Sequence, residues 1–587
     1  MQQKIQLKQV SRRIDYLMIL VALLVSLFLT TLVYAEKSEV LTKKSFKVTN
    51  LPGLSTKPDF KQYAGYLTVD KKFQDNLFFW MFESQSSPQK DPLLIWLSGG
   101  PGCSSIAAMF EENGPFKLER KGKAIQLKKN PYSWNAKANI IYLDQPVGTG
   151  MSYSDTETFT KNQYEVSKQF YEFLKQFYKV FPEYQKNPLF ITGESYAGHM
   201  IPGIANYILD QEGKPDSIHV NLQGLAIGNG WIDPMQQREV FPDVFYAAGL
   251  IDANKRDKAK KLFKMAVENG GAPEVDDFGP GAGGEGYKFP DMKPGVPCPG
   301  LILPAEFKTD SSALALKKLL DKYTGKNLNA SLSLKDFIEL IDIVGNGPEG
   351  LRKLLPQEIA VVFLDHSYAH LVFQFFLERL VSYTEHSGNY VNLMDALNYG
   401  PTIFVGLPLN WPADDAIFQE YMDMPEVRAA LNTQSYPHEK TQPCNAMVSY
   451  VFNYINSEFQ KSFLFVFPRL LSEIPVLFYN GQNDMICSPM GTREFLMQIA
   501  KDPLVFNFPG KAEYSNAPYV PWVAKEKQTD SQTSGGLYEN RYGYYKRAGN
   551  LHFLNVLDAS HMVPLSKPEA AQILINDFIH KGKIITD

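Results

Sequence analysis

The chain has 587 residues, of which 44% are hydrophobic and 21% charged, the composition of a folded globular protein with a large core. A net charge of −4 provides no basic face and argues against nucleic-acid binding. With 41 Gly, 38 Pro and 4 Cys, the chain is neither collagen-like nor a disulfide scaffold. The composition favours an enzyme.

An apolar run over residues 16–34 follows a basic amino-terminal segment. It ends at Val33-Tyr34-Ala35, a small-x-small pattern that signal peptidase accepts. The run is also long enough to span a bilayer, so residues 1–35 are either a cleaved signal peptide or an uncleaved signal anchor, and only the anchor would hold the chain in a membrane. Both place the remainder in the secretory lumen, where disulfides form. The N-glycosylation acceptor at Asn329 agrees with this compartment.

Short β-rich runs alternate with helical patterns over the first part of the chain. The pattern predicts a hairpin over 63–82 with its turn at 70–75, strands at 93–97, 139–143, 189–192 and 222–227, and helices at 162–181 and 198–210. Strands that alternate with helices indicate an α/β protein with a mostly parallel sheet.

The alternation breaks in the middle of the chain and returns near its end. Residues 268–300 are rich in Gly and Pro and predict an exposed loop, and residues 305–400 predict helices. Buried strands return at 474–480 and 551–557, after a polar, tyrosine-rich stretch at 525–550 that predicts an irregular loop leading to a hairpin. We expect one core split by an insertion, with an independently folded second domain as the alternative. The expected parts are the core at 45–235, a mainly helical cap at 236–405 and the rest of the core at 406–587.

A nucleophile elbow is predicted at Gly193-Glu194-Ser195-Tyr196-Ala197. A serine with small residues two positions before and after it, between a strand and a helix, fits a turn too tight for larger flanking side chains. The second flanking residue is Ala197 instead of the usual glycine. The pattern predicts Ser195 as a nucleophile.

An elbow requires an acid and then a histidine, each in a loop after a later strand. Of the three histidines beyond residue 450, His552 lies within a strand pattern, His580 lies near the end of a terminal helix, and His561 follows the strand at 551–557. His561 is therefore the predicted base. Asp484 follows the strand at 474–480 and would orient the imidazole.

The oxyanion hole should combine the amide after the nucleophile with one from a glycine-rich loop. Tyr196 provides the first amide, and the loop at 98–105 (SGGPGCSS) provides the second. No Lys-Ser/Thr pair follows this loop, so it does not match a phosphate-binding loop.

At this point the sequence resembles the serine carboxypeptidases, a branch of the α/β-hydrolase fold. The resemblance rests on six ordered blocks: WLSGGPGCSS (96–105), LDQPVGTGMSYS (143–154), GESYAGHMIP (193–202), IGNGWIDP (227–234), NGQNDMIC (480–487) and HMVP (561–564). It is greatest with the Golgi prohormone-processing branch around Trp231 and over 544–564. The resemblance implies a mostly parallel sheet flanked by helices with a large helical cap, and removal of C-terminal residues through an acyl-enzyme.

The resemblance also assigns a site for the substrate's terminal carboxylate. It implies the Gly100 and Tyr196 amides as the oxyanion hole, and it implies carboxylate binding by Gly99, Glu112 and Glu194. At the remaining position, where the family has Asn, this chain has Ser98. Two converging carboxyls cannot both ionise readily, so one stays protonated and can donate a hydrogen bond. We therefore expect activity that is highest at acidic pH.

The cysteines are also assigned by the resemblance. It implies a disulfide between Cys103 and Cys444 and a free thiol at Cys487 beside the acid, which leaves Cys298 unpaired. The pair His366 and His370 lies one helical turn apart but lacks the glutamate of a zinc-protease motif. We expect no metal and no cofactor.

The expected substrates are the C-termini of peptides or proteins. One alternative is a serine-carboxypeptidase-like acyltransferase, because such relatives depart from Asn at the position of Ser98. Another is a non-catalytic protective partner of other lumenal enzymes. The preferred C-terminal residue, a homodimeric state, and the destination (lysosome or vacuole, secretion, or Golgi) stay open.

Overall fold

In the computed structural model the chain divides into two compact units, Met1–Ser45 and Phe46–Asp587. The structure describes residues 41–156, 159–249, 251–254, 256–257, 259–260, 390–391, 399–400, 414–445, 448, 458, 461–501, 507–523 and 541–586. Several predictions lie outside these residues: the apolar run at 16–34, the loop at 268–300, Cys298, Asn329 and the pair His366 and His370. Within the part of the chain that is described, no helix has the length and apolar character needed to cross a membrane.

A 12-stranded sheet forms the centre of the second unit, counted over the described residues. In spatial order its strands are β1 (Lys47–Val48), β2 (Gln62–Asp70), β3 (Asp75–Phe82), β7 (Asn139–Leu143), β4 (Leu93–Leu97), β9 (Leu189–Glu194), β10 (Leu222–Gly228), β13 (Val476–Gly481), β16 (Leu551–Val556), β15 (Arg541–Ala548) and β14 (Val520–Val523), with β8 (Tyr153–Ser154) beside β3. The run from β7 to β16 is parallel throughout, and the strands at both ends pair antiparallel.

Helices cover both faces of this sheet, because its central strands carry apolar side chains on both faces. Strand β4 is an example. Its LLIWL sequence is fully buried, with Leu93, Ile95 and Leu97 in one hydrophobic core and Leu94 and Trp96 in the other. A strand buried on both faces reads as a continuous apolar run, as parallel sheets require.

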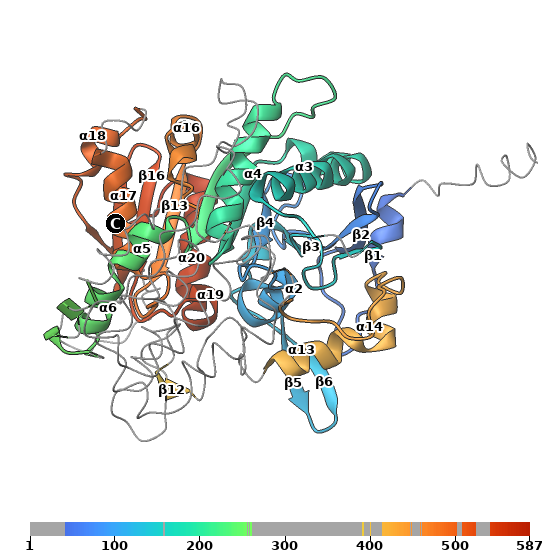
Figure 1. The fold of residues 1–587 in the computed structure, drawn as a ribbon. Helices are drawn as coiled ribbons and strands as arrows, with labels where there is room; N and C mark the ends of the chain where they lie inside the picture. The colour runs from blue at the N-terminus through green and yellow to red at the C-terminus, as the bar shows by residue number, and fades with distance from the viewer. Residues whose placement is uncertain are drawn as a thin grey trace, which may run out of the picture. The chain divides into compact units, whose positions relative to one another are not determined.

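The helices divide between the two cores. Those contributing to the first core are α3 (Gln163–Val180), α4 (Ala197–Gln211), α6 (Phe241–Ala247), α16 (Phe467–Glu473), α17 (Pro489–Lys501) and α18 (Lys511–Tyr514). Those contributing to the second are α2 (Ser105–Ala108), α13 (Asp414–Asp423), α14 (Pro425–Ala430), α19 (Val563–Ser566) and α20 (Pro568–Lys581). Figure 1 shows α3 and α4 side by side over one face of the strands. The layering is that of an α/β-hydrolase, so the predicted fold class is confirmed.

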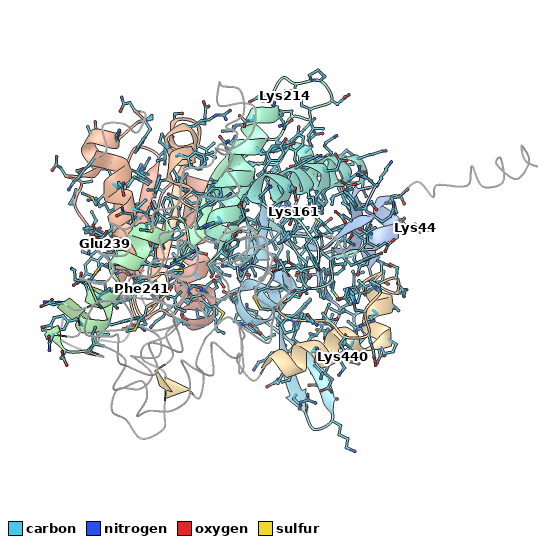
Figure 2. All side chains as sticks on the ribbon, in the orientation of Figure 1. Lys44, Lys161, Lys214, Glu239, Phe241 and Lys440 are labelled. Carbon is cyan, nitrogen blue, oxygen red and sulfur yellow. A yellow bond between two sulfur atoms is a disulfide. The ribbon has the colours of Figure 1, made fainter. Side chains whose placement is uncertain are left out.

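The side chains follow the same division between core and surface. Lys161, Lys214 and Lys440, labelled in Figure 2, are exposed. Phe241, which begins α6, is buried.

All the strands predicted from sequence form, and the helices predicted at 162–181 and 198–210 form as α3 and α4. A second hairpin is present as the antiparallel pair β15–β16, but the prediction of an irregular loop over 525–550 is wrong at Arg541–Ala548, which forms β15 because it pairs with β16. The hairpin β5–β6 (Phe116–Lys121 and Ala124–Lys129) had no prediction. The only described residues between 305 and 400 form two short strands, β11 (Tyr390–Val391) and β12 (Tyr399–Gly400), where the sequence predicted helix. The extent of the 236–405 insertion stays a prediction.

Candidate active site

The predicted site residues gather at one edge of the sheet, where the parallel strands end. Gly99 follows β4, Ser195 follows β9, Asp484 follows β13 and His561 follows β16. Carboxyl ends of parallel strands share an edge, which is where α/β folds bind their ligands. A cavity of about 100 Å³ is lined by eight of the predicted residues: Ser98, Gly99, Gly100, Glu112, Glu194, Ser195, Tyr196 and His561.

Ser195 sits on a strained turn between β9 and α4. Its φ is 60°, in the left-handed region, and its side chain is partly exposed. A non-glycine residue held there costs about 1–3 kcal/mol, which the surrounding structure must offset. A Cβ at Gly198 would lie 2.7 Å from the backbone nitrogen of Trp231, and one at Gly193 would lie 2.9 Å from the Cβ of Ala197. The small residues of the motif are therefore needed to close the turn.

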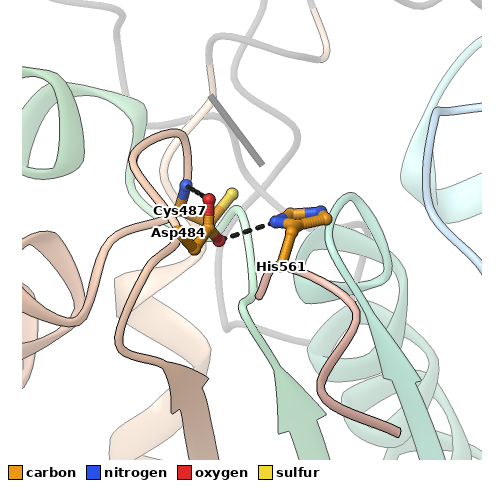
Figure 3. A group of neighbouring side chains, drawn as sticks. All are labelled: Asp484, Cys487 and His561. Atoms are coloured by element: carbon orange, nitrogen blue, oxygen red, sulfur yellow. Dashed lines mark hydrogen bonds and ion pairs between the residues drawn. The ribbon is translucent and has the colours of Figure 1, made fainter. Parts of the chain in front are cut away.

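Asp484 and His561 form a buried hydrogen-bonded pair (Figure 3). His561 Nδ1 lies 2.6 Å from Asp484 Oδ2, and both side chains are at most 2% exposed. Asp484 Oδ1 also accepts from the amides of Ile486 at 2.9 Å and Cys487 at 3.2 Å. These bonds fix the carboxylate so that it can hold the imidazole in one orientation.

The other ring nitrogen of His561 is available for proton transfer. Nε2 is buried and has no hydrogen-bond partner among the described residues, and its ring lines the same cavity as Ser195. Burial lowers the pKa of His561, but the charge and hydrogen bond of Asp484, with a contribution from Glu112, outweigh it, so the pKa is raised overall. A histidine that is oriented by a carboxylate and lines the same cavity as a serine hydroxyl is compatible with acyl transfer.

Cys487 lies beside this pair, and ligand atoms of Asp484, Cys487 and His561 lie within 4.8 Å of one another. A metal site would need a thiolate. Burial, and then the charges of Asp484 and Glu194, raise the pKa of the Cys487 thiol well above its ordinary value. The Nδ1 of the histidine is also already bonded to the carboxylate. The donor set therefore fits proton transfer better than metal binding.

Two glutamates form a second buried group in the cavity. Glu194 ends β9, and Glu112 lies on a π-helical turn, η2 (Met109–Asn113), that continues from α2. Burial raises the pKa of Glu112 to about 7, although its hydrogen bond with Glu194 and the charge of Lys117 oppose the shift. Burial, and then the charge of Glu112, raise the pKa of Glu194 well above its usual range.

This pair can donate a hydrogen bond into the cavity. Oε2 of Glu112 and Oε2 of Glu194 are buried and have no hydrogen-bond partner among the described residues. With both pKa values raised, protonated carboxyls persist at acidic pH. A protonated carboxyl donates to a carboxylate, which an ionised one would repel.

Ser98 presents a hydroxyl at the cavity wall. Its Oγ accepts from the indole nitrogen of Trp96 at 3.1 Å, and its own amide donates to Ser105 Oγ at 3.0 Å. An indole nitrogen only donates, so the Ser98 hydroxyl proton remains for another acceptor. Next to it, a Cβ at Gly99 would lie 2.5 Å from the amide nitrogen of Tyr196. The absence of a side chain at Gly99 brings the glycine loop and the elbow together.

The disulfide Cys103–Cys444 is present, in the pairing that the resemblance implied, and it joins residues 341 positions apart. Both cysteines line the cavity. The amide of Ser104 donates to the carbonyl of Pro443 at 2.7 Å. The glycine loop is thus fastened to the segment that follows α14.

Two buried polar residues of the site had no prediction. Asn229, after β10, has a φ of 40°, donates from Nδ2 to Asp484 Oδ2 at 2.6 Å and accepts from the Gly481 amide at 3.0 Å. Asp144, after β7, accepts hydrogen bonds from the segment after the glycine loop. Asn229 lies in the motif block at 227–234 and Asp144 in the block at 143–154. Each directly follows a strand, and this position is the sequence feature that could have identified them as site residues.

The fold and this site define an α/β-hydrolase of the nucleophile-elbow type. The sequence model of the family described as "Serine carboxypeptidase" matches residues 52–282 and 400–581, more than half of the chain. The chain therefore belongs to the serine carboxypeptidase family, S10, and is a serine-type carboxypeptidase.

Individual relatives agree with this assignment. "Serine carboxypeptidase S10 family member 2" from Dictyostelium discoideum is 31% identical over 93% of this chain and 78% of its own. The vitellogenic carboxypeptidase of Aedes aegypti is 29% identical over 95% of this chain and 90% of its own. The crystal structure of the prohormone-processing carboxypeptidase Kex1Δp from Saccharomyces cerevisiae superposes with a TM-score of 0.64 at 24% identity, covering 93% of this chain and 98% of that one, and supports the fold.

Proposed function

We propose that this carboxypeptidase removes the last residue of a peptide by attack of Ser195 on the terminal peptide carbonyl. As the Oγ–C bond forms, His561 takes the serine proton, and it then gives that proton to the leaving amine as the C–N bond breaks. A water molecule, activated by the same nitrogen, hydrolyses the acyl-enzyme and restores the serine. Asp484 stabilises the imidazolium that forms in both steps.

The oxyanion of each tetrahedral intermediate accepts hydrogen bonds from the amides of Gly100 and Tyr196. The close approach of Gly99 to the elbow supports this assignment, because it holds the glycine loop against the turn that carries the Tyr196 amide. Loss of one such donor typically costs about 3 kcal/mol of barrier stabilisation.

The observation that carries the exopeptidase assignment is the buried pair Glu112 and Glu194 in the same cavity as Ser195. A protonated carboxyl from this pair donates to the substrate's terminal carboxylate, together with the Gly99 amide and the Ser98 hydroxyl. An endopeptidase would have no use for such a donor set, because an internal peptide bond has no carboxylate beside it. Binding of the substrate carboxylate is therefore tightest at acidic pH and weakens as the pair ionises. Turnover also needs neutral His561, so the raised pKa of that histidine sets the acidic limit of activity.

The protein works in the secretory lumen under this proposal. The disulfide Cys103–Cys444 supports it, because structural disulfides persist in oxidising compartments and are rare in the cytosol. The site within the pathway is not part of the proposal.

Ser98 favours one alternative, an acyltransferase that passes the acyl group to an alcohol. The test compares hydrolysis of an N-blocked dipeptide with transfer to an added alcohol, in the wild type and in Ser98→Asn. A carboxypeptidase hydrolyses the dipeptide in preference to transfer, and Ser98→Asn keeps that preference. Transfer that exceeds hydrolysis in the wild type, and that reverses in Ser98→Asn, would support the acyltransferase.

A further inference from the structure

Asp144 is a fully buried carboxylate directly after β7. Its Oδ1 accepts from the Ser104 hydroxyl at 2.8 Å, the Ser105 amide at 2.8 Å and the Ile106 amide at 3.4 Å. Its Oδ2 accepts from the Met151 amide at 2.8 Å. One side chain therefore joins two segments, the start of α2 at 104–106 and the turn at 150–151.

The first of these segments directly follows the glycine turn of the proposed oxyanion hole. Ser105 uses its amide to bond Asp144 and its Oγ to accept from the amide of Ser98 at 3.0 Å. The Cys103 amide in turn donates to the carbonyl of Gly99 at 3.1 Å. The position of the 98–100 backbone thus depends on Ser105, and the position of Ser105 depends on Asp144.

The same bonds fix the start of the helical segment that carries Glu112. Helix α2 begins at Ser105 and continues without a break into η2. Ser104 caps it through its hydroxyl, and Asp144 accepts from that hydroxyl and from the first-turn amides. A shift of this helix start would move Glu112 as well as the glycine turn.

The second segment keeps the carboxylate enclosed. A Cβ at Gly150 would contact Asp144 Oδ2, and the carbonyl of Gly150 accepts from the Tyr436 hydroxyl at 2.9 Å. Burial raises the pKa of Asp144 to about 6, although its hydrogen bonds from Met151, Ser104, Ile106 and Ser105 oppose the shift. Holding a carboxylate at this depth is costly, as expected for a group retained for placement.

From this geometry we infer that Asp144 is a positioning residue: it sets the 98–112 segment so that the oxyanion donor and the carboxylate-binding groups face Ser195 together. The inference rests on the proposed function of that segment. It predicts that a change at Asp144 affects recognition of the terminal carboxylate more than turnover itself.

Asp233 provides a matched control. It is 4% exposed, it caps α5 (Pro234–Glu239) by accepting from the amides of Met235 at 3.0 Å and Gln236 at 3.1 Å, and it accepts from the Ser462 hydroxyl at 3.1 Å. Asp144 and Asp233 are thus both buried aspartates that accept from a helix start and a serine hydroxyl. Of the hydrogen bonds that the two side chains make to described residues, those of Asp144 reach the 98–112 segment and those of Asp233 do not.

The experiment measures kcat and KM of the full-length wild type, Asp144→Asn and Asp233→Asn on two substrates. One is an N-blocked dipeptide with a free carboxylate, and the other is the ethyl ester of the same N-blocked residue, which forms the same acyl-enzyme without a terminal carboxylate. Thermal midpoints are recorded for each variant, and rates are compared at a temperature where all are folded.

We expect Asp144→Asn to lower kcat/KM for the dipeptide by about 100-fold and for the ester by about tenfold, as misplacement of positioned groups does. Asp233→Asn should change both by less than about threefold while it lowers the thermal midpoint.

If Asp144→Asn does not fold, Ser105→Ala removes the acceptor of the Ser98 amide and should raise KM for the dipeptide alone. Equal losses on the two substrates, in Asp144→Asn or in Ser105→Ala, would overturn the inference. Wild-type protein that cleaves neither substrate would instead overturn the proposed function.

Discussion

Replacing Glu112 with glutamine should remove most of the pH dependence of KM for peptide substrates. A rise in its pKa from 4.5 to about 7 corresponds to about 3 kcal/mol against the ionised form. Below about pH 7 the protonated carboxyl donates to the substrate carboxylate, and above it the ionised carboxyl repels that carboxylate. The wild-type KM should therefore rise by roughly tenfold for each pH unit above that pKa.

A glutamine at this position is neutral at every pH and can still donate. The KM of Glu112→Gln should stay level from pH 5 to 8.5, at a value less than about tenfold above the wild-type minimum, because a neutral amide replaces the carboxyl donor. Burial is the largest cause of the raised pKa of Glu194, and this substitution does not remove it.

The assay is initial-rate hydrolysis of an N-blocked dipeptide from pH 4 to 8.5, with the corresponding ethyl ester as the control that lacks the carboxylate. Only the dipeptide should show the pH-dependent KM, and only in the wild type. The same rise of KM in Glu112→Gln, or an equal rise for the ester, would refute the reasoning.

Three further substitutions test the remaining parts of the site. Asp484→Asn should lower kcat by about 10⁴-fold, because the amide holds the histidine in the wrong tautomer; a loss below tenfold in steady-state assays would contradict this role. Gly99→Ala puts a Cβ 2.5 Å from the Tyr196 amide nitrogen and should lower kcat/KM by about 100-fold without unfolding the protein, whereas near-wild-type rates would show that the loop need not approach the elbow. Cys444→Ser opens a crosslink over 341 positions and should cost about 2–5 kcal/mol of unfolding free energy in denaturant titrations, and an unchanged midpoint would contradict this prediction.

The sequence predicted the core of this fold because the deciding patterns are local. β4 and β7 are unbroken apolar runs, and the elbow around Ser195 needs small residues at fixed positions in a single turn. The order of Ser195, Asp484 and His561 followed from the strand ends after which they lie. These features depend on a few neighbouring residues, so they can be read without the tertiary structure.

Contacts between distant segments could not be predicted in the same way. Asn229 bonds an aspartate 255 positions away, and the sequence around it reads as an ordinary Asn-Gly turn. In the sequence Asp144 is simply the residue after a strand, and its four donors come from the start of α2 and from the turn at Met151. Glu112 was predicted as a site residue from the family resemblance alone, because a π-helical turn has no recognisable period in the sequence. The contacts of such residues with the site can be recognised only in the folded structure, where the strand ends lie side by side.

The most direct test of the central claim is release of the C-terminal residue from an N-blocked dipeptide between pH 4 and 8, by full-length wild type and Ser195→Ala. The account predicts release that decreases above about pH 7 in the wild type, as Glu112 ionises, and that is absent in Ser195→Ala, with a serine-directed inhibitor labelling only the wild type. Release that persists in Ser195→Ala, or that increases steadily toward pH 8, would contradict the account.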